Sequence, residues 1–276
     1  MVTAVPTRAR GRRRRGPGWV PNQHGAWAML VLPAVVGAAH AGVRWWHLVL
    51  LAAWLSAYLA YFAVGLWLKS RRRPRYLPPV RAYAATTAVL GALVVVGEPA
   101  VLRWGLVYAP LLATSLVLVA RRADRTVTND LVMVAAASLL AVVAHAGAVP
   151  TGAGPAWLPG GGDPHGWVLA GVLLAYFAGT VPYVKTMIRA RGDRRMYAAS
   201  VALHGALAAG AGAWAVAAAA GGLGDLRLAV WLTVLAVLLA VRAAVVPRRW
   251  PAATPKQVGL GEIAASAALA LVLLLA

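Results

Sequence analysis

The stretch from Leu174 to His204, LAYFAGTVPYVKTMIRARGDRRMYAASVALH, decides the fold: an apolar helix runs into a basic turn, and a second apolar helix leaves it. The same plan occurs at residues 59–87, LAYFAVGLWLKSRRRPRYLPPVRAYAATT. Both segments begin with Leu-Ala-Tyr-Phe-Ala, continue to a Lys with an Arg four residues later, and reach a Tyr that opens the next helix. A repeat with a period far longer than a solenoid unit predicts two copies of a multi-helix module. The alternative is a chance match between Ala- and Leu-rich helices whose basic turns are ordinary anchors.

Composition sets the class of protein. The 276 residues are 61% hydrophobic and 12% charged, and the mean hydropathy is +0.71. Such a chain is too apolar for a soluble domain and indicates a polytopic membrane protein. The net charge of +20 would suggest a nucleic-acid partner in a soluble chain, but membrane proteins collect Lys and Arg in cytoplasmic loops, so no nucleic acid is expected. The absence of cysteine excludes disulfides, thiolate catalysis and Cys-ligated metals.

The apolar runs predict an all-α fold, a polytopic transmembrane bundle with a two-fold internal pseudo-repeat. At roughly 20 residues per span, the chain accommodates about nine helices. They are expected near residues 26–42, 45–68, 82–97, 100–120, 129–148, 166–187, 196–219, 226–246 and 258–276.

The distribution of basic residues predicts the topology. With the N-terminus inside, all of the 27 Lys and Arg residues except Arg44, Arg103 and Arg227 fall on the inner side. This asymmetry predicts a multi-pass protein of the bacterial cytoplasmic membrane with a cytoplasmic N-terminus and an outside C-terminus.

The domain organisation follows from the same pattern. Residues 1–20 are expected to form a disordered basic cytoplasmic tail, and residues 21–276 a single transmembrane domain. Its halves, 21–148 and 166–276, are joined by an outside loop at 149–165 that is rich in Gly and Pro.

The candidate site lies at the cytoplasmic mouth. Lys185 and Arg189 share one helix face, and Lys69 with Arg73 repeats that spacing. Two such faces could converge on one cavity and bind an anion, because guanidinium groups grip phosphate bidentately. The alternative for each cation is a snorkelling anchor.

Other polar residues are weaker candidates. His24 and His204 could supply hydrogen bonds or proton transfer near the basic turns, although a lone His in a bundle more often bonds a neighbouring helix. Arg122, Asn129 and Asp130 come from a third turn, where a helix N-cap is the competing role. No Walker loop, Ser-His-Asp set, carboxylate cluster or zinc motif occurs, so no metal or cofactor is expected and no catalytic residue is assigned.

The segment before the first helix carries a family resemblance. Pro21-Asn22-Gln23-His24-Gly25-Ala26-Trp27-Ala28-Met29, with Pro33 and Gly37, resembles the opening signature of the YwiC-like family of bacterial integral membrane proteins, whose function is largely undefined.

A more distant resemblance concerns architecture. The helix number and the motifs after the second and sixth helices resemble the UbiA superfamily of intramembrane prenyltransferases, which implies a ring of helices around a lipid-open cavity. Leu118 to Asp130 also resembles that superfamily's turn between helices 4 and 5. The Asp-rich motifs are degenerate, because the first position is basic and the second retains only Asp193. Metal-dependent prenyl transfer is therefore not expected, and the sequence leaves open whether the protein is an enzyme.

Three functions remain in competition. The first is binding, with or without modification, of an anionic or isoprenoid lipid in a cavity open to the cytoplasm, the ligand being an isoprenoid or a phospholipid from the surrounding bilayer. The second is transport of a small solute or ion, which the near absence of charges at the middle of the membrane disfavours. The third is a non-catalytic membrane component that acts through protein partners, which the sequence does not identify.

Overall fold

The computed structural model describes residues 18–21, 26–146, 164–222 and 224–276, and the described chain is helical apart from its turns. Most of the predicted tail, His24 and most of the predicted outside loop lie outside the described residues. The helices are α1 (Ala26–Ala41), α2 (Trp45–Lys69), α3 (Leu77–Gly97), α4 (Gly105–Ala120), α5 (Val127–Ala146), α6 (Pro164–Ile188), α7 (Arg194–Ala219), α8 (Leu226–Arg249) and α9 (Pro255–Leu275). Two short 3-10 helices, Pro74–Tyr76 and Pro99–Trp104, precede α3 and α4.

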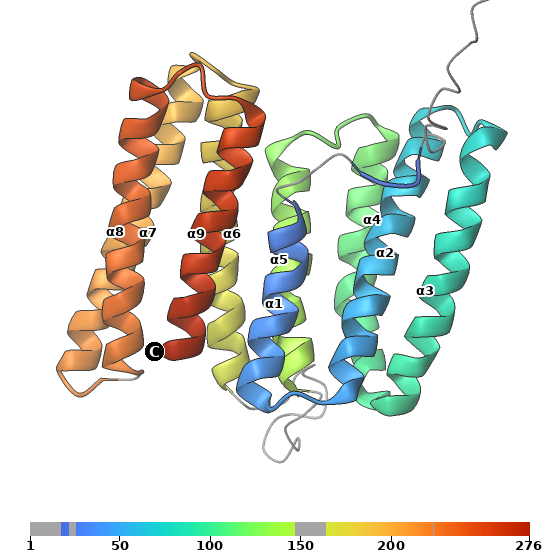
Figure 1. The fold of residues 1–276 in the computed structure, drawn as a ribbon, viewed down its shortest axis with the longest axis horizontal. Coiled ribbons are helices and arrows are strands. Elements are labelled where there is room, and N and C mark those ends of the chain that lie inside the picture. Colours follow the sequence, from blue (N-terminus) through green and yellow to red (C-terminus); the bar gives the residue numbers. More distant parts are fainter. Residues whose placement is uncertain (1–17, 22–25, 147–163, 223) are drawn as a thin grey trace, which may run out of the picture.

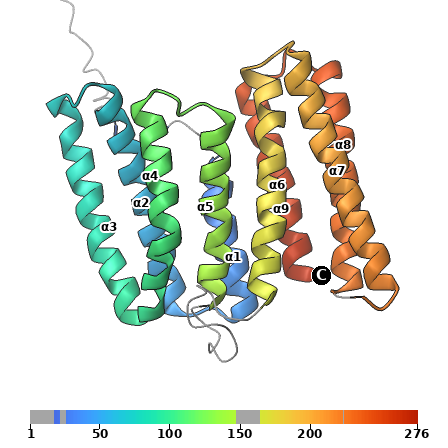
Figure 2. The same cartoon turned by 180° about the vertical axis from the view of Figure 1, so that it is seen from behind.

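The helices stand side by side in two rows (Figures 1 and 2). One row holds α2, α1, α9 and α8, the other holds α4, α5, α6 and α7, and α3 flanks α2 at one end. The rows pack directly on each other where α1 meets α5. The UbiA resemblance implied a ring of helices around a central cavity, whereas in this part of the chain α1 contacts α5, α6 and α9 in the middle of the bundle.

Local chemistry sets the helix ends. Asp193 and Asp225 cap α7 and α8 by accepting hydrogen bonds from backbone N–H groups, and Thr254 forms a capping box at the start of α9. The observed α3 begins five residues earlier than predicted because Pro78 and Pro79 occupy its first turn, where a missing N–H has no cost. The predicted span at 100–120 covers the 3-10 helix Pro99–Trp104 together with α4, and the other predicted spans agree with the observed helices to within three residues.

Eight of the described helices are long and apolar enough to cross a membrane when α3 and α4 are counted with the 3-10 helices that precede them, and α1 is the exception. It has 16 residues, fewer than a typical span needs, and packs closely on α5. A Cβ added at Gly37 would lie 2.3 Å from the carbonyl oxygen of Ala141, so this glycine permits the approach of α1 to α5. The fold is a transmembrane helical bundle, as predicted, although its first helix is shorter than a full span.

The two halves also meet at the end of the bundle where the chain terminates. His40 of α1 donates a hydrogen bond of 2.7 Å to the carbonyl oxygen of Leu273 in α9. Nε2 of His165 in α6 lies 3.1 Å from Nδ1 of the same His40. These contacts give structural roles to two histidines for which the sequence suggested none.

The basic turns all lie at the opposite end of the bundle. The α2–α3, α4–α5, α6–α7 and α8–α9 connections are together at one end, which we call the basic face (Figure 1). This clustering is the arrangement that the charge pattern predicted. The internal repeat remains a prediction, because gathering the turns at one face does not require the halves to be equivalent.

Candidate functional site

The two predicted lysines both end at the α4–α5 turn. Lys69 Nζ lies 2.9 Å from a carboxylate oxygen of Asp124, and Lys185 Nζ lies 2.7 Å from one of Asp130. Lys185 also donates to the carbonyl oxygen of Arg125 at 2.7 Å. Both lysines thus reach one turn, where acids compensate their charges, and their convergence on an anion-binding cavity remains a prediction.

The third turn acts as the link between these lysines. Asn129 is buried, accepts a 2.7 Å hydrogen bond from Ser115 and donates to the carbonyl oxygen of Asp124. Arg122 has a positive φ of 59° and donates to the carbonyl oxygen of Lys69. The contacts of Asn129 and Arg122 are those of residues that hold the turn together.

Asp124 shows the electrostatic effect of the pairing. Burial alone raises the pKa of this carboxyl, but the hydrogen bond and positive charge of Lys69 outweigh it, so the pKa is below its ordinary value. Asp124 is therefore a charged partner of Lys69 at neutral pH.

The remaining predicted residues do not join these lysines in one site. Arg73 and Arg189 are exposed at the basic face. His204 is 3% exposed and bonds through Nδ1 to the carbonyl oxygen of Ser200, about three turns inside α7. His204 thus lies inside the bundle, and its role in hydrogen bonding or proton transfer remains a prediction. Its ring packs edge-on to Tyr183 of α6, while its hydrogen bond stays within α7, so the alternative of a hydrogen bond to a neighbouring helix is not among the described contacts.

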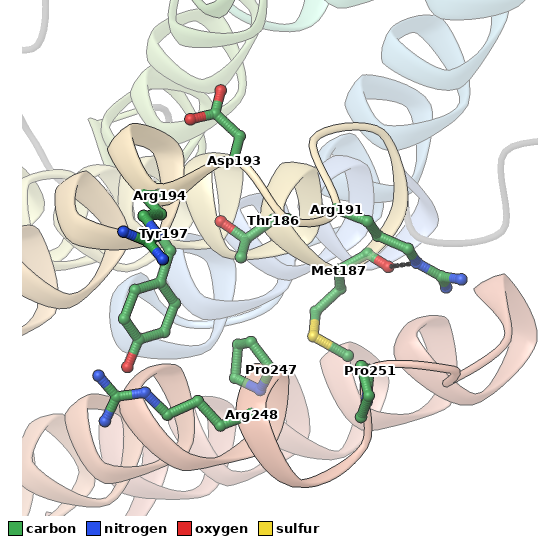
Figure 3. Close-up of a pocket in the computed structure, with 10 residues that line it drawn as sticks. Thr186, Met187, Arg191, Asp193, Arg194, Tyr197, Pro247, Arg248 and Pro251 are labelled. Carbon is green, nitrogen blue, oxygen red and sulfur yellow. Dashed lines mark hydrogen bonds between the residues drawn. The ribbon is translucent and has the colours of Figure 1, made fainter.

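A pocket of about 420 Å³ opens between α6, α7 and α8 at the basic face (Figure 3). Its walls come from the end of α6, the following turn, the start of α7 and the end of α8. They consist of Thr186, Met187, Arg191, Gly192, Asp193, Arg194, Tyr197, Pro247, Arg248 and Pro251.

Cations outnumber acids around this pocket, and some of its charged groups already have hydrogen-bond partners. Its single acid, Asp193, already accepts hydrogen bonds from the backbone N–H groups that open α7. Arg191 is also engaged, since it donates to the carbonyl oxygens of Met187 and Ala253 and so ties the α6–α7 turn to the α8–α9 connection. Arg194 and Arg248 form no ion pair within the described chain, which leaves two cations at the rim.

Tyr197 positions one of these two cations. Its hydroxyl donates a 2.8 Å hydrogen bond to the carbonyl oxygen of Ala244, which joins α7 to α8. The guanidinium carbon of Arg248 lies 4.9 Å from the centre of its ring (Figure 3). Such a stacked guanidinium keeps its edge free for hydrogen bonds to an oxyanion.

A buried ion pair lies deeper in the same half of the protein. Nη1 of Arg242 in α8 is 2.8 Å from Oε1 of Glu262 in α9, and the two side chains are 18% and 10% exposed. One ion pair thus lies inside α8 and α9, about two turns from their basic ends, where the sequence suggested almost no charge. The predicted helix at 226–246 placed Arg242 about one turn from its inner end, whereas α8 continues about two turns beyond Arg242 to Arg249.

Arg191, Arg194 and Arg248 were not predicted from the sequence as a group. The cations around the α6–α7 turn and at the end of α8 are visible in the sequence, but the sequence alone did not show that these segments meet. The predicted cations were chosen instead from the Lys–Arg spacing that the α2–α3 and α6–α7 turns share.

Comparison with known proteins gives the family. The model of the YwiC-like protein family matches residues 20–145, which span α1 to α5 and include the opening signature. The chain is 31% identical over 177 residues, 63% of its length and 69% of the relative's, to the uncharacterized protein YwiC of Bacillus subtilis. It is 26% identical over 185 residues, 67% of its length and 74% of the relative's, to an uncharacterized protein of Haemophilus influenzae.

No solved structure matches the chain, so the comparisons do not support a relationship to the UbiA enzymes. The extent of the match to the Bacillus subtilis relative, together with the family model, settles the assignment that the nonapeptide suggested: the chain belongs to the YwiC-like family of membrane proteins.

Proposed function

We propose that the basic-face pocket binds the phosphate-bearing head of an anionic amphiphile, either a phospholipid or an isoprenoid phosphate. The observation that carries this proposal is the pair of cations at its rim, Arg194 and Arg248, facing a cavity whose single carboxylate is already used as a helix cap. Arg binds phosphate oxygens through two parallel N–H groups, which gives the pocket a preference for oxyanions over neutral solutes.

The surroundings of the pocket favour a ligand with an apolar tail. Val241 and Val245 of α8 are 54% and 47% exposed and lie one to two turns below Arg248. Valines exposed on a membrane-spanning helix face lipid, since the bilayer is as apolar as they are. A head group held by Arg248 would therefore leave its chain on the lipid-facing side of α8.

The basic face is proposed to be cytoplasmic. Membrane proteins keep Lys and Arg in short cytoplasmic loops, and the four connections at this face, together with the helix ends beside them, carry most of those in the described chain. Because the chain has no cysteine, single cysteines placed at Arg189 and at Arg227 can be labelled separately in intact cells. We expect an impermeant maleimide to label only the cysteine at position 227. Labelling of only the cysteine at position 189 would overturn the orientation.

The pocket is tested by native mass spectrometry with lipid analysis on protein purified in mild detergent. Wild type is expected to retain an enriched anionic lipid that Arg194→Gln/Arg248→Gln loses. The matched control is Arg189→Gln/Arg195→Gln, which removes the same charge from exposed residues beside the pocket and should leave retention unchanged. Equal loss in both double variants would reduce the effect to net charge and contradict a specific pocket.

A further inference from the structure

The Arg242–Glu262 pair lies too deep in the bundle to anchor the helices at the membrane surface. Arg242 lies about two turns from the last residue of α8, and Glu262 about two turns from the first residue of α9. Each charge is thus roughly 10 Å from the basic end of its helix, too far for an anchor at the membrane surface. Ionisable groups inside a membrane are costly and mark functional sites more often than structural ones.

The pair leaves part of its hydrogen-bonding capacity unused. Only Nη1 of Arg242 meets the carboxylate, while Nε and Nη2 are buried and have no hydrogen-bond partner in the described part of the chain. Oε2 of Glu262 is unpartnered in the same way, and Glu262 is 8% exposed. Because two of its nitrogens have no partner, the guanidinium can donate hydrogen bonds to a second oxyanion while it stays in the same position.

The groups facing the pair come from each helix packed around it. From α6, the ring of Tyr183 lies 4.2 Å from the guanidinium carbon of Arg242, and the hydroxyl of Tyr176 is 3.0 Å from Ser266 of α9. His204 of α7 stands beside Tyr183. The titratable group of α1 within the described residues, His40, is at the far end of α9 and does not face the pair. Arg242 and Glu262 are therefore the two charged members of an otherwise neutral polar cluster.

The cluster lies directly beneath the pocket. Met187 lines the pocket and packs in one buried group with Tyr183, one turn further into α6. On α8, the pocket residue Pro247 is likewise little more than one turn from Arg242. Arg242 is thus the next cation inward from Arg194 and Arg248 along these two helices.

We propose that Arg242 is an interior oxyanion site, which Glu262 occupies as an internal anion in this structure. An incoming carboxylate or phosphodiester monoanion replaces Glu262 on the guanidinium as Glu262 takes up one proton. One negative charge and one proton enter together, so the ion pair becomes an arginine–ligand pair beside a neutral carboxylic acid, and the net charge of the buried cluster does not change. The site differs from the surface pocket in its residues, and it binds with or without occupation of that pocket.

Coupling between proton and anion follows from the geometry. Two anions on one buried guanidinium repel each other, so a bound ligand favours the neutral form of Glu262. By linkage, protonation of Glu262 favours the ligand to the same extent. For an exchange of one proton, affinity is expected to rise by up to tenfold for each unit of decrease in pH.

The test uses two probes that carry one negative charge throughout pH 5.5 to 7.5: dimethyl phosphate, which represents a free ligand, and short-chain phosphatidylglycerol, which represents a lipid head group. Binding is measured by calorimetry in the Arg194→Gln/Arg248→Gln background, so that failure of the surface pocket does not affect the result. Binding of dimethyl phosphate would assign the site to free anions, and binding of phosphatidylglycerol alone would assign it to lipid.

Three proteins are compared in that background. With Glu262 intact, affinity is expected to rise up to a hundredfold from pH 7.5 to 5.5. Glu262→Gln should bind tightly at both values, and Arg242→Gln/Glu262→Gln should not bind. Equal affinity of the first two proteins at pH 7.5, or pH dependence that persists in Glu262→Gln, would overturn the proposal.

A second measurement in the Arg194→Gln/Arg248→Gln background keeps Arg242 and Glu262 intact, so it does not depend on whether variants of the pair fold. In weakly buffered solution, binding of either probe should take up close to one proton per anion. Anion binding without proton uptake would contradict the exchange even if Arg242 proved to be the site.

Discussion

Replacing Arg242 alone by Met should leave the carboxylate of Glu262 without a partner in the apolar interior. The two atoms of the ion pair are 2.8 Å apart and Glu262 is 8% exposed, so the charge loses its partner without gaining water. Removing one member of a buried pair typically costs about 3–5 kcal/mol. The protein can limit this cost by protonating the carboxylate.

The cost of that protonation sets the magnitude. A free glutamate titrates near pH 4.3, so holding it neutral at pH 7 costs about 2.7 × 1.36, or about 4 kcal/mol. At pH 5 the same step costs about 1 kcal/mol. Arg242→Met should therefore lower the free energy of unfolding by about 4 kcal/mol at pH 7 and by much less at pH 5, because protonation needs less free energy as the pH falls.

The assay is denaturant unfolding in detergent micelles, followed by the fluorescence of the 12 tryptophans. The control is Arg242→Met/Glu262→Leu, which removes both charges and should remain within about 1 kcal/mol of wild type, since apolar side chains often replace a buried pair at no cost. A single variant as stable as the double variant at pH 7, or a deficit that does not shrink on acidification, would refute the claim that the pair is buried and desolvated.

Two further predictions concern the rest of the fold. Gly37→Ala should destabilise the protein by about 2 kcal/mol or more, because its Cβ would lie 2.3 Å from the carbonyl oxygen of Ala141; Gly171→Ala, with nothing within 4 Å, is the control and should leave the unfolding midpoint unchanged or higher. Burial raises the pKa of Asp124, but Lys69 lowers it by more, so the folded pKa is below that of an unfolded aspartate. The pair should therefore stabilise the protein at any pH above the unfolded pKa, and this stabilisation should be lost as the pH falls through the folded pKa. Unfolding midpoints of wild type and Asp124→Asn should therefore differ at neutral pH and converge in acid, and a constant difference would contradict the pairing.

The helices could be predicted from the sequence because lipid imposes a simple requirement. Each span needs an apolar run of nearly fixed length, and the basic turns mark where most runs end. The exception at α3 shows the limit of this logic. The predicted helix began at residue 82, but α3 also includes Pro78 and Pro79, because proline at the start of a helix gives up no hydrogen bond.

The pairing of side chains was harder to predict because several turns carry similar charges. Lys69 and Lys185 have the same spacing to an Arg, yet nothing in that spacing shows that both meet the acids of the α4–α5 turn. Arg194 at the start of α7 and Arg248 at the end of α8 likewise lie close together only in the folded chain.

The Arg242–Glu262 pair could have been found from the sequence. The two residues lie about equally far on either side of the turn at residues 250–254, so an antiparallel helical hairpin places them level with each other. The signal was missed because the turn was expected to begin at residue 247, which moved Arg242 close to the helix end. An extension of α8 through Pro247 changes the environment of a charge from the membrane surface to its interior.

The central claim is that the pocket between α6, α7 and α8 holds an anionic head group. Its most direct test is a cryo-electron microscopy map, at side-chain resolution, of the protein in nanodiscs made from its native membrane. The account predicts density for a phosphate group within hydrogen-bonding distance of Arg194 and Arg248, continuing as an acyl or prenyl chain along Val241 and Val245. Lipid density confined to the outer surfaces of the helices, with none between these two arginines, would contradict it.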